Sequence, residues 1–233
     1  PLSVPTRAAH AQGVRLAEEF IRRYLQDHGD WPSGVIVDLW GSATMRTAGE
    51  EFSMALHLLG VRPVWTEGTE RVSGFEILPL PLLDRPRIDV TLRVSGLFRD
   101  VFPSLSGLFQ QAVEALAVRP ETPDWNPYMA SSETARIYGP APGSYGLGMG
   151  AAAEQFSDAG RQAAADAWLE ASSYALNAEG SFQDKQGIQN RVAQADSFIH
   201  LQDLPETDLL LSADYAAHEA GFAAAKAGVG GQA

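Results

Sequence analysis

The stretch GVIVDLWGSATMRTAGEEFSMALHLLG, residues 34–60, sets the expected fold class. Its first part, residues 34–41, is a short apolar run rich in β-branched residues, which is typical of a buried strand. The following residues, 43–60, have the pattern of a helix that closes at Gly60. A buried strand that leads directly into a helix is the repeating unit of α/β proteins with a parallel sheet.

A second strand is predicted in PRIDVTLRVSGLFRDVFP, residues 86–103. Apolar residues alternate there with charged or hydroxyl residues, which is the period of a strand with one apolar face. Residues 103–117 then predict a helix with Pro103 at its first position, and residues 5–28 predict another helix. This alternation predicts an α/β fold, with a mainly parallel sheet flanked by helices.

The segment RPETPDWNPYMASSETA, residues 119–135, is rich in Pro, Ser and Thr and is interpreted as a connector. Before it we expect an α/β subdomain at residues 1–118. After it, residues 136–233 are alanine-rich and are expected to form a mostly helical subdomain that contains a glycine-rich loop. The absence of an initiating Met suggests a piece of a longer protein or a processed chain.

Composition excludes several classes of function. The formal charge of −12 argues against nucleic acid or an anionic membrane surface as the main partner. The chain has no cysteine, which rules out disulfides, thiolate catalysis, cysteine zinc sites and iron–sulfur clusters. Any metal must therefore be held by His, Asp, Glu or backbone oxygen. No long apolar span and no signal peptide is found.

The glycine-rich loop at residues 146–151, GLGMGA, fits a loose dinucleotide-binding pattern. That pattern requires its glycines directly after a strand, whereas here residues 140–145 intervene. No G-x-x-x-x-G-K-[ST] motif is present, so the sequence has no P-loop. A nucleotide-binding domain is one hypothesis, and a loop shaped for close backbone approach is the favoured one.

The helix predicted at residues 43–60 carries a polar stripe. Arg46, Glu50, Ser53 and His57 are spaced to share one face of that helix. The helix would start at the carboxyl edge of the sheet, where ligands bind in open α/β folds. The alternative is a solvated stripe with an Arg46–Glu50 pair, and spacing alone favours it.

Imidazole and carboxylate groups gather in a second segment, at residues 198–221. His200 and Asp203 lie among apolar residues, and Asp214 and His218 are one helical turn apart. Such a pair could hold a metal, since imidazole with carboxylate suits zinc, cobalt, nickel or iron. The alternative is that the two side chains of each pair bond to one another, and it is the more common outcome.

Charged residues also flank the end of the strand predicted within residues 86–103. Arg93, Arg99 and Asp100 stand there among apolar neighbours. Fixed guanidinium groups suit bidentate binding of carboxylates. An equally favoured alternative is a buried Arg–Asp network that braces the turn from strand to helix.

Four stretches in this order give the chain a family resemblance. It resembles the large, tetrapyrrole-binding subunit of aerobic cobaltochelatase, which is related to the large subunit of magnesium chelatase, over about residues 4–226. The cobalt branch fits better, through DWNP at 124–127 and SADYAAHEAGF at 212–222. The stretches that carry the resemblance are residues 37–65, 85–103, 135–150 and 198–225.

The resemblance implies a chelatase. Such a subunit inserts cobalt(II) into hydrogenobyrinic acid a,c-diamide, in cobalamin biosynthesis in the cytoplasm, while AAA+ ATPase and adaptor subunits hydrolyse ATP. The missing P-loop agrees with that division of labour. The alternatives are magnesium insertion into protoporphyrin and a non-catalytic tetrapyrrole- or metal-binding module. These subunits exceed a thousand residues, so we do not expect 233 residues to chelate alone.

The resemblance also implies roles for residues. It makes Glu50, His200 and Asp214 the expected catalytic groups. Members of the family often have acidic residues where this chain has Leu211 and Ala213, so Asp214 would act alone there. The expected metal-handling residues are Glu50, His57, His200, Asp203 and Asp208. The expected ring-binding residues are Trp40, Arg93, Arg99 and Tyr145.

Overall fold

The computed structural model describes residues 3–130, 135–145, 158–200 and 222–228. These residues contain a six-stranded sheet in the order β7–β6–β5–β4–β1–β8. Strands β8, β1, β4 and β5 run parallel, while β6 and β7 are antiparallel to their neighbours. The bounds are β1 (Gly34–Leu39), β4 (Asp89–Val94), β5 (Ile137–Gly139), β6 (Tyr174–Asn177), β7 (Gly180–Gln183) and β8 (Ser197–Ile199).

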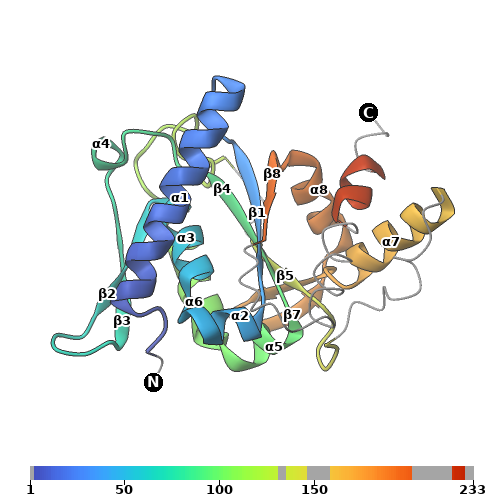
Figure 1. The fold of residues 1–233 in the computed structure, drawn as a ribbon, viewed down its shortest axis with the longest axis horizontal. Coiled ribbons are helices and arrows are strands. Elements are labelled where there is room, and N and C mark those ends of the chain that lie inside the picture. The colour runs from blue at the N-terminus through green and yellow to red at the C-terminus, as the bar shows by residue number, and fades with distance from the viewer. Residues whose placement is uncertain (1–2, 131–134, 146–157, 201–221, 229–233) are drawn as a thin grey trace.

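Helices cover both faces of this sheet, which confirms the predicted α/β class. Figure 1 shows α1, α3 and α6 on one side of the sheet and α7 and α8 on the other. A separate antiparallel pair is formed by β2 (Val61–Trp65) and β3 (Val72–Ile77). The helices are α1 (Arg7–His28), α2 (Gly41–Thr47), α3 (Glu50–Leu59), α4 (Leu80–Leu83), α5 (Gly96–Val101), α6 (Pro103–Ala117), α7 (Asp158–Glu170) and α8 (Lys185–Gln194).

Strand β1 is apolar except for Asp38 because both of its faces are covered. All six of its residues are buried. Val35, Val37 and Leu39 pack in the cluster under α1, α3 and α6, whereas Ile36 packs in the cluster under α7 and α8. A strand in this position has no solvent side, so its sequence shows a continuous apolar run instead of an alternation.

The charged face of β4 is also buried, which explains its unusual sequence. Val90, Leu92 and Val94 point into the first cluster. Asp89, on the other face, accepts hydrogen bonds from Arg136 and Arg191, each at 2.8 Å. Asp89 therefore pairs with two arginines from later in the chain, and its side chain is only 20% exposed.

The prediction of a single helix over residues 43–60 was wrong. Ala48 and Gly49 have φ values of 58° and 95°, and this left-handed pair separates α2 from α3. Arg46 therefore leaves the predicted stripe. The alternative of a solvated stripe fails for Ser53, which is fully buried, and for His57, which is 9% exposed, whereas Arg46 is exposed and Glu50 is half-buried.

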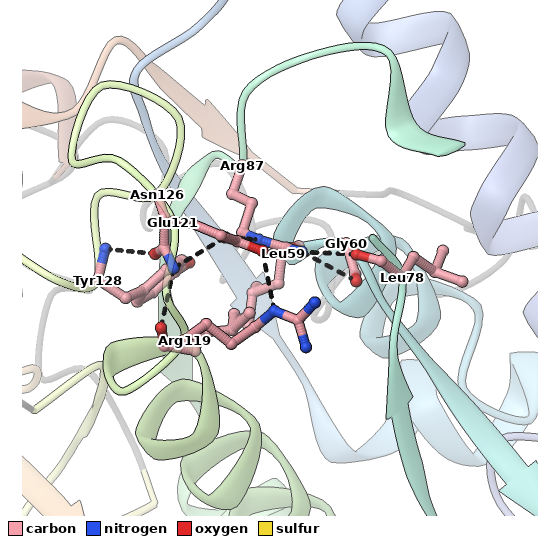
Figure 2. Close-up of polar contacts among 9 residues, drawn as sticks. Leu59, Gly60, Leu78, Arg87, Arg119, Glu121, Asn126 and Tyr128 are labelled. Atoms are coloured by element: carbon pink, nitrogen blue, oxygen red, sulfur yellow. Dashed lines mark hydrogen bonds and ion pairs between the residues drawn. The ribbon is translucent and has the colours of Figure 1, made fainter. Parts of the chain in front are cut away.

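A buried arginine fixes the carboxyl end of α3 (Figure 2). The Arg87 guanidinium donates to the carbonyl oxygens of Leu59, Gly60 and Leu78 at 3.0, 3.2 and 2.7 Å. It also binds the Glu121 carboxylate through two hydrogen bonds of 2.9 and 2.8 Å. The last carbonyls of a helix have no partner within the helix, so Arg87 satisfies them and complements the helix dipole.

Glu121 belongs to the segment predicted as a connector, and the same network holds that segment in place. Asn126 is fully buried and donates to Glu121 at 3.0 Å and to the Leu116 carbonyl at 2.8 Å. Tyr128 donates from its hydroxyl to the carbonyl of Ile88 at 2.8 Å. Sheet strands lie on both sides of this segment, with β1 and β4 before it and β5 to β8 after it.

Candidate functional site

Three parallel strands place one polar side chain each at the same level of the sheet. Asp38 of β1 is directly opposite Arg93 of β4 in the strand register. On the other side of β1, Val37 is opposite Ile199 of β8, so His200 follows beside Asp38. We call Arg93, Asp38 and His200 the Asp38 row. It lies at the carboxyl ends of the strands, where open α/β sheets bind ligands.

The Asp38 carboxylate connects this row. Its Oδ2 lies 3.2 Å from Nδ1 of His200 and accepts a hydrogen bond of 2.7 Å from Nε1 of Trp40. Its Oδ1 forms an ion pair of 3.7 Å with the Arg93 guanidinium. The side chains of Asp38, Arg93 and His200 are 0%, 2% and 2% exposed. Low local polarity strengthens these interactions, so the carboxylate fixes its neighbours firmly.

Arg93 is also held from the opposite direction. Its Nε donates to Ser172 Oγ and its Nη2 to the carbonyl of Ala171, each at 3.1 Å. Complete burial lowers the pKa of Arg93, and the Asp38 carboxylate opposes that shift. The residues between α7 and β6 therefore brace the guanidinium against Asp38.

Trp40 brings an aromatic surface to the edge of the row. It is half-buried and precedes α2, whose first residue, Gly41, donates its backbone N–H to Ser95 Oγ at 3.1 Å. The indole and the His200 imidazole are 6.2 Å apart with an interplanar angle of 67°. This edge-to-face arrangement orients both rings.

Two glutamates begin α3. The predicted Glu50 is its first residue and is half-buried. Glu51 is 3% exposed, and its Oε2 accepts from Thr47 Oγ1 at 2.9 Å. Its other oxygen, Oε1, has no hydrogen-bond partner among the residues that the structure describes. The RTAGEE motif therefore holds a buried carboxylate beside the half-buried one that the sequence analysis selected.

His57 lies seven residues after Glu50 in α3, about 10 Å further along the helix axis. Its Nε2 is 2.6 Å from the Glu18 carboxylate of α1, and burial lowers its pKa while Glu18 opposes that shift. The structure thus places His57 in the contact between α1 and α3. Asp203, Asp208 and Asp214 lie outside the residues that the structure describes. Among the described residues, no group of three His, Asp or Glu side chains could hold a metal ion.

Arg99 and Tyr145 meet at a second cluster. The Arg99 guanidinium binds the Asp100 carboxylate at 2.7 Å and the carbonyls of Pro140 and Ala141 at 2.9 and 3.0 Å. Tyr145, which is 63% exposed, donates its hydroxyl to Asp100. Hydrogen bonds from Arg99 and from Tyr145 lower the pKa of Asp100. This cluster fastens the loop after β5 to α5 and leaves the tyrosine ring accessible.

The profile of the family described as CobN/Magnesium Chelatase matches residues 1–233. The chain belongs to the CobN/magnesium chelatase family. The resemblance read from the four sequence stretches is thereby confirmed.

Relatives within the CobN/magnesium chelatase family are much longer than this chain. The aerobic cobaltochelatase subunit CobN of Sinorhizobium sp. is 38% identical over 98% of the chain and 20% of that protein. The CobN of Pseudomonas aeruginosa is 40% identical over 96% of the chain and 20% of that protein. The magnesium-chelatase subunit ChlH of Oryza sativa subsp. japonica is 28% identical over 90% and 16%.

A solved structure from the CobN/magnesium chelatase family has the same fold. The catalytic subunit of cobaltochelatase from Mycobacterium tuberculosis superposes with a TM-score of 0.90 and 32% identity, over 100% of this chain and 21% of that one. The chain therefore spans about a fifth of the length of the relatives it matches. No helix among the described residues is long and apolar enough to cross a membrane.

Sequence reasoning missed the residue that joins the others. Trp40, Arg93 and His200 were selected, and all three contact Asp38, which was not. Asp38 is the single charged residue in the apolar run GVIVDLW, and that isolation is the signal that could have found it. Charged residues are rarely buried without partners.

Proposed function

We propose that this chain takes part in the insertion of cobalt(II) into hydrogenobyrinic acid a,c-diamide, as part of the tetrapyrrole-binding subunit of an ATP-dependent complex. The observation that carries the proposal is the Asp38 row, at the ligand-binding edge of the sheet. The greater identity to the CobN proteins than to ChlH supports cobalt over magnesium. Cobalt(II) is here a substrate and not a resident cofactor.

The Asp38 row suits the proton chemistry of metal insertion. A tetrapyrrole must lose its pyrrole N–H protons to the surroundings when the metal enters, and a positioned base accelerates that transfer. In the row, Asp38 faces Nδ1 of His200, so Nε2 is the imidazole nitrogen directed away from the carboxylate. Asp38 thereby orients His200 as a proton acceptor, with Arg93 paired to the other oxygen of the carboxylate.

Metal delivery requires oxygen and nitrogen ligands that bind a dehydrated cobalt ion and then release it. Glu50 and His200 are the proposed first groups, with Asp203, Asp208 and Asp214 as further candidates and His57 as a more remote one. Glu51 joins them because it is a buried carboxylate next to Glu50. In this proposal ATP is hydrolysed on AAA+ partner subunits, with which the chain assembles in the cytoplasm through an adaptor.

Trp40 and Tyr145 are the proposed aromatic surfaces for the macrocycle, since both rings are accessible in part. Arg93 and Arg99 are proposed ring-carboxylate anchors, but their guanidinium groups bind other groups of this chain, which favours a bracing role. The substitutions Arg93→Ala and Arg99→Ala separate the two roles. Loss of stability with unchanged tetrapyrrole affinity assigns them to bracing, and loss of affinity in a folded protein assigns them to anchoring.

The choice of substrate is tested by comparing two tetrapyrroles. The dissociation constants of the chain for hydrogenobyrinic acid a,c-diamide and for protoporphyrin are measured from ring absorbance and fluorescence. Tighter binding of the corrinoid precursor is expected. Tighter binding of protoporphyrin would instead favour magnesium chelatase, the second candidate function, which the 28% identity to ChlH keeps in consideration.

A further inference from the structure

A cavity of about 480 Å³ lies between α6 and the β6–β7 hairpin. Ser106, Gln110 and Glu114 line it from α6 at a spacing of four residues, which places them on one face of the helix. The hairpin provides residues 177–181, and the lining also includes the apolar side chains of Ile137 and Leu176. Its size is within the range of about 300–1,000 Å³ that is usual for ligand pockets.

Two buried oxygens in this lining have no hydrogen-bond partner. Gln110 Nε2 donates to the Glu114 carboxylate at 3.0 Å, and because a carboxylate only accepts, this fixes Oε1 on the other side of the amide. Gln110 and Ser106 are each 7% exposed, and Gln110 Oε1 and Ser106 Oγ are unbonded among the described residues. An unbonded buried acceptor lowers stability, so a donor that reaches it is favourable.

The charge of the lining also favours a donor. Glu114 on α6 and Glu179 on the hairpin give carboxylates to two opposing walls. Arg99 lines the cavity too, but its Nε and Nη2 bind Asp100 and its Nη1 binds the carbonyls of Pro140 and Ala141. The complementary ligand is therefore a cation with N–H donors and an apolar stem.

The cavity opens beside an exposed sheet edge. Strand β7 ends the sheet order, and all four of its residues are exposed. Gly180 and Ser181 belong both to β7 and to the cavity lining. An exposed edge strand offers its backbone N–H and C=O groups to another extended segment, which then sends alternate side chains to each face of the sheet.

We propose that β7 and this cavity bind an extended polypeptide segment, which pairs with β7 and places a Lys or Arg side chain between Glu114 and Glu179. The stem of that side chain would contact Ile137 and Leu176, and its N–H groups would reach the carboxylates and Gln110 Oε1. The lining includes none of Asp38, Trp40, Arg93 or His200. Of the residues proposed for tetrapyrrole binding it shares only Arg99, whose guanidinium binds Asp100 and two backbone carbonyls.

The test uses a synthetic peptide, acetyl-Thr-Val-Lys-Val-Thr-amide, titrated into the chain by isothermal calorimetry and amide NMR. A peptide with norleucine in place of lysine keeps the stem and removes the charge, and it should bind about fivefold more weakly. Glu114→Gln should weaken the lysine peptide by about the same factor. Glu67→Gln, at an exposed acidic residue of the β2–β3 turn, is the matched control and should leave affinity unchanged.

Four results would overturn the proposal. Equal affinity for the lysine and norleucine peptides would remove the cation requirement. Equal effects of Glu114→Gln and Glu67→Gln, with both variants folded by circular dichroism, would place the peptide elsewhere. Binding of n-butylammonium alone as tightly as the lysine peptide would make the cavity a small-amine site with no role for β7. Absence of binding by any probe counts against it equally.

Discussion

The Asp38 carboxylate contacts side chains that lie far apart in the sequence. Trp40, Arg93 and His200 meet there because β1, β4 and β8 are neighbours in the sheet. A buried ion pair gains little over an apolar pair, but removing one partner leaves the other charge buried and uncompensated. The net stabilisation from the Asp38–Arg93 pair is therefore small, although loss of either partner is costly.

Replacing Asp38 should show that loss of one partner costs more stability than the intact ion pair provides. Asp38→Asn is expected to lower the free energy of unfolding by about 3–5 kcal/mol, because the Arg93 guanidinium stays buried without its counter-charge. The measurement is urea denaturation. The double variant Asp38→Leu/Arg93→Met should lose less than the sum of the two single changes.

The matched control is Asp84→Asn, at an exposed residue with a φ of 54° that Asn also tolerates. It should change the free energy of unfolding by no more than about 0.5 kcal/mol. If Asp38→Asn were as mild as Asp84→Asn, the carboxylate would not compensate Arg93.

Glu121 makes stability depend on pH in a defined window. Hydrogen bonds from Arg87 lower the pKa of Glu121 from its ordinary 4.5 to about 2 in the folded protein. Its contribution is therefore fully present above the unfolded value of 4.5 and is lost as the pH falls through about 2. At neutral pH this shift is worth on the order of 3 kcal/mol.

The check is the free energy of unfolding between pH 2 and pH 6 for the wild type and for Glu121→Gln. The difference between the two proteins should be largest at pH 6 and should shrink as the pH falls. A difference that stays constant across that range would mean that Glu121 does not titrate in this way.

Among the elements, the contact between α1 and α3 depends on the absence of a side chain at Gly13. A Cβ placed there would lie 2.5 Å from the Cβ of Ser53 and 2.6 Å from the carbonyl oxygen of Glu50. The two helices can approach closely only because this position is glycine. The packing also fixes the start of α3, which carries Glu50 and Glu51.

Two glycine substitutions test this contact in opposite directions. Gly13→Ala should lower the free energy of unfolding by about 1–3 kcal/mol, because the added methyl group forces the helices apart. Gly107→Ala in α6 meets nothing within 4 Å and should raise it by about 0.5–1 kcal/mol through helix propensity. Thermal or urea unfolding measures both, and equal effects of the two changes would show that Gly13 is not a packing requirement.

The predicted elements held where the pattern was local and failed where it was not. Helices α1 and α6 and strands β1 and β4 followed from periodicity and capping residues. The break at Ala48 and Gly49 was missed, because the apolar pattern continues across it and only the left-handed backbone reveals it. The β6–β7 hairpin lies in a region that was expected to be mostly helical because it is rich in alanine, which favours helices. Pairing with the sheet overrides that local preference.

For the whole molecule, the family followed from long ordered motifs, whereas the site followed only in part. Trp40, Arg93 and His200 were predicted as site residues from separate motifs. Their contact could not be predicted, because a single sequence does not reveal the order of strands in a sheet. Asp38 was missed for the same reason. Its role appears only when β4 and β8 are placed on either side of β1.

We propose that the carboxyl edge of this sheet handles cobalt(II) beside a bound tetrapyrrole. The most direct measurement titrates the chain with hydrogenobyrinic acid a,c-diamide, with and without cobalt(II), beside Glu50→Ala/His200→Ala and the exposed-histidine control His28→Ala. Ring binding by all three proteins, with cobalt(II) affinity lost only in the double variant, is the predicted result. Cobalt(II) affinity that survives in the double variant, or no ring binding by the folded chain, would contradict the claim.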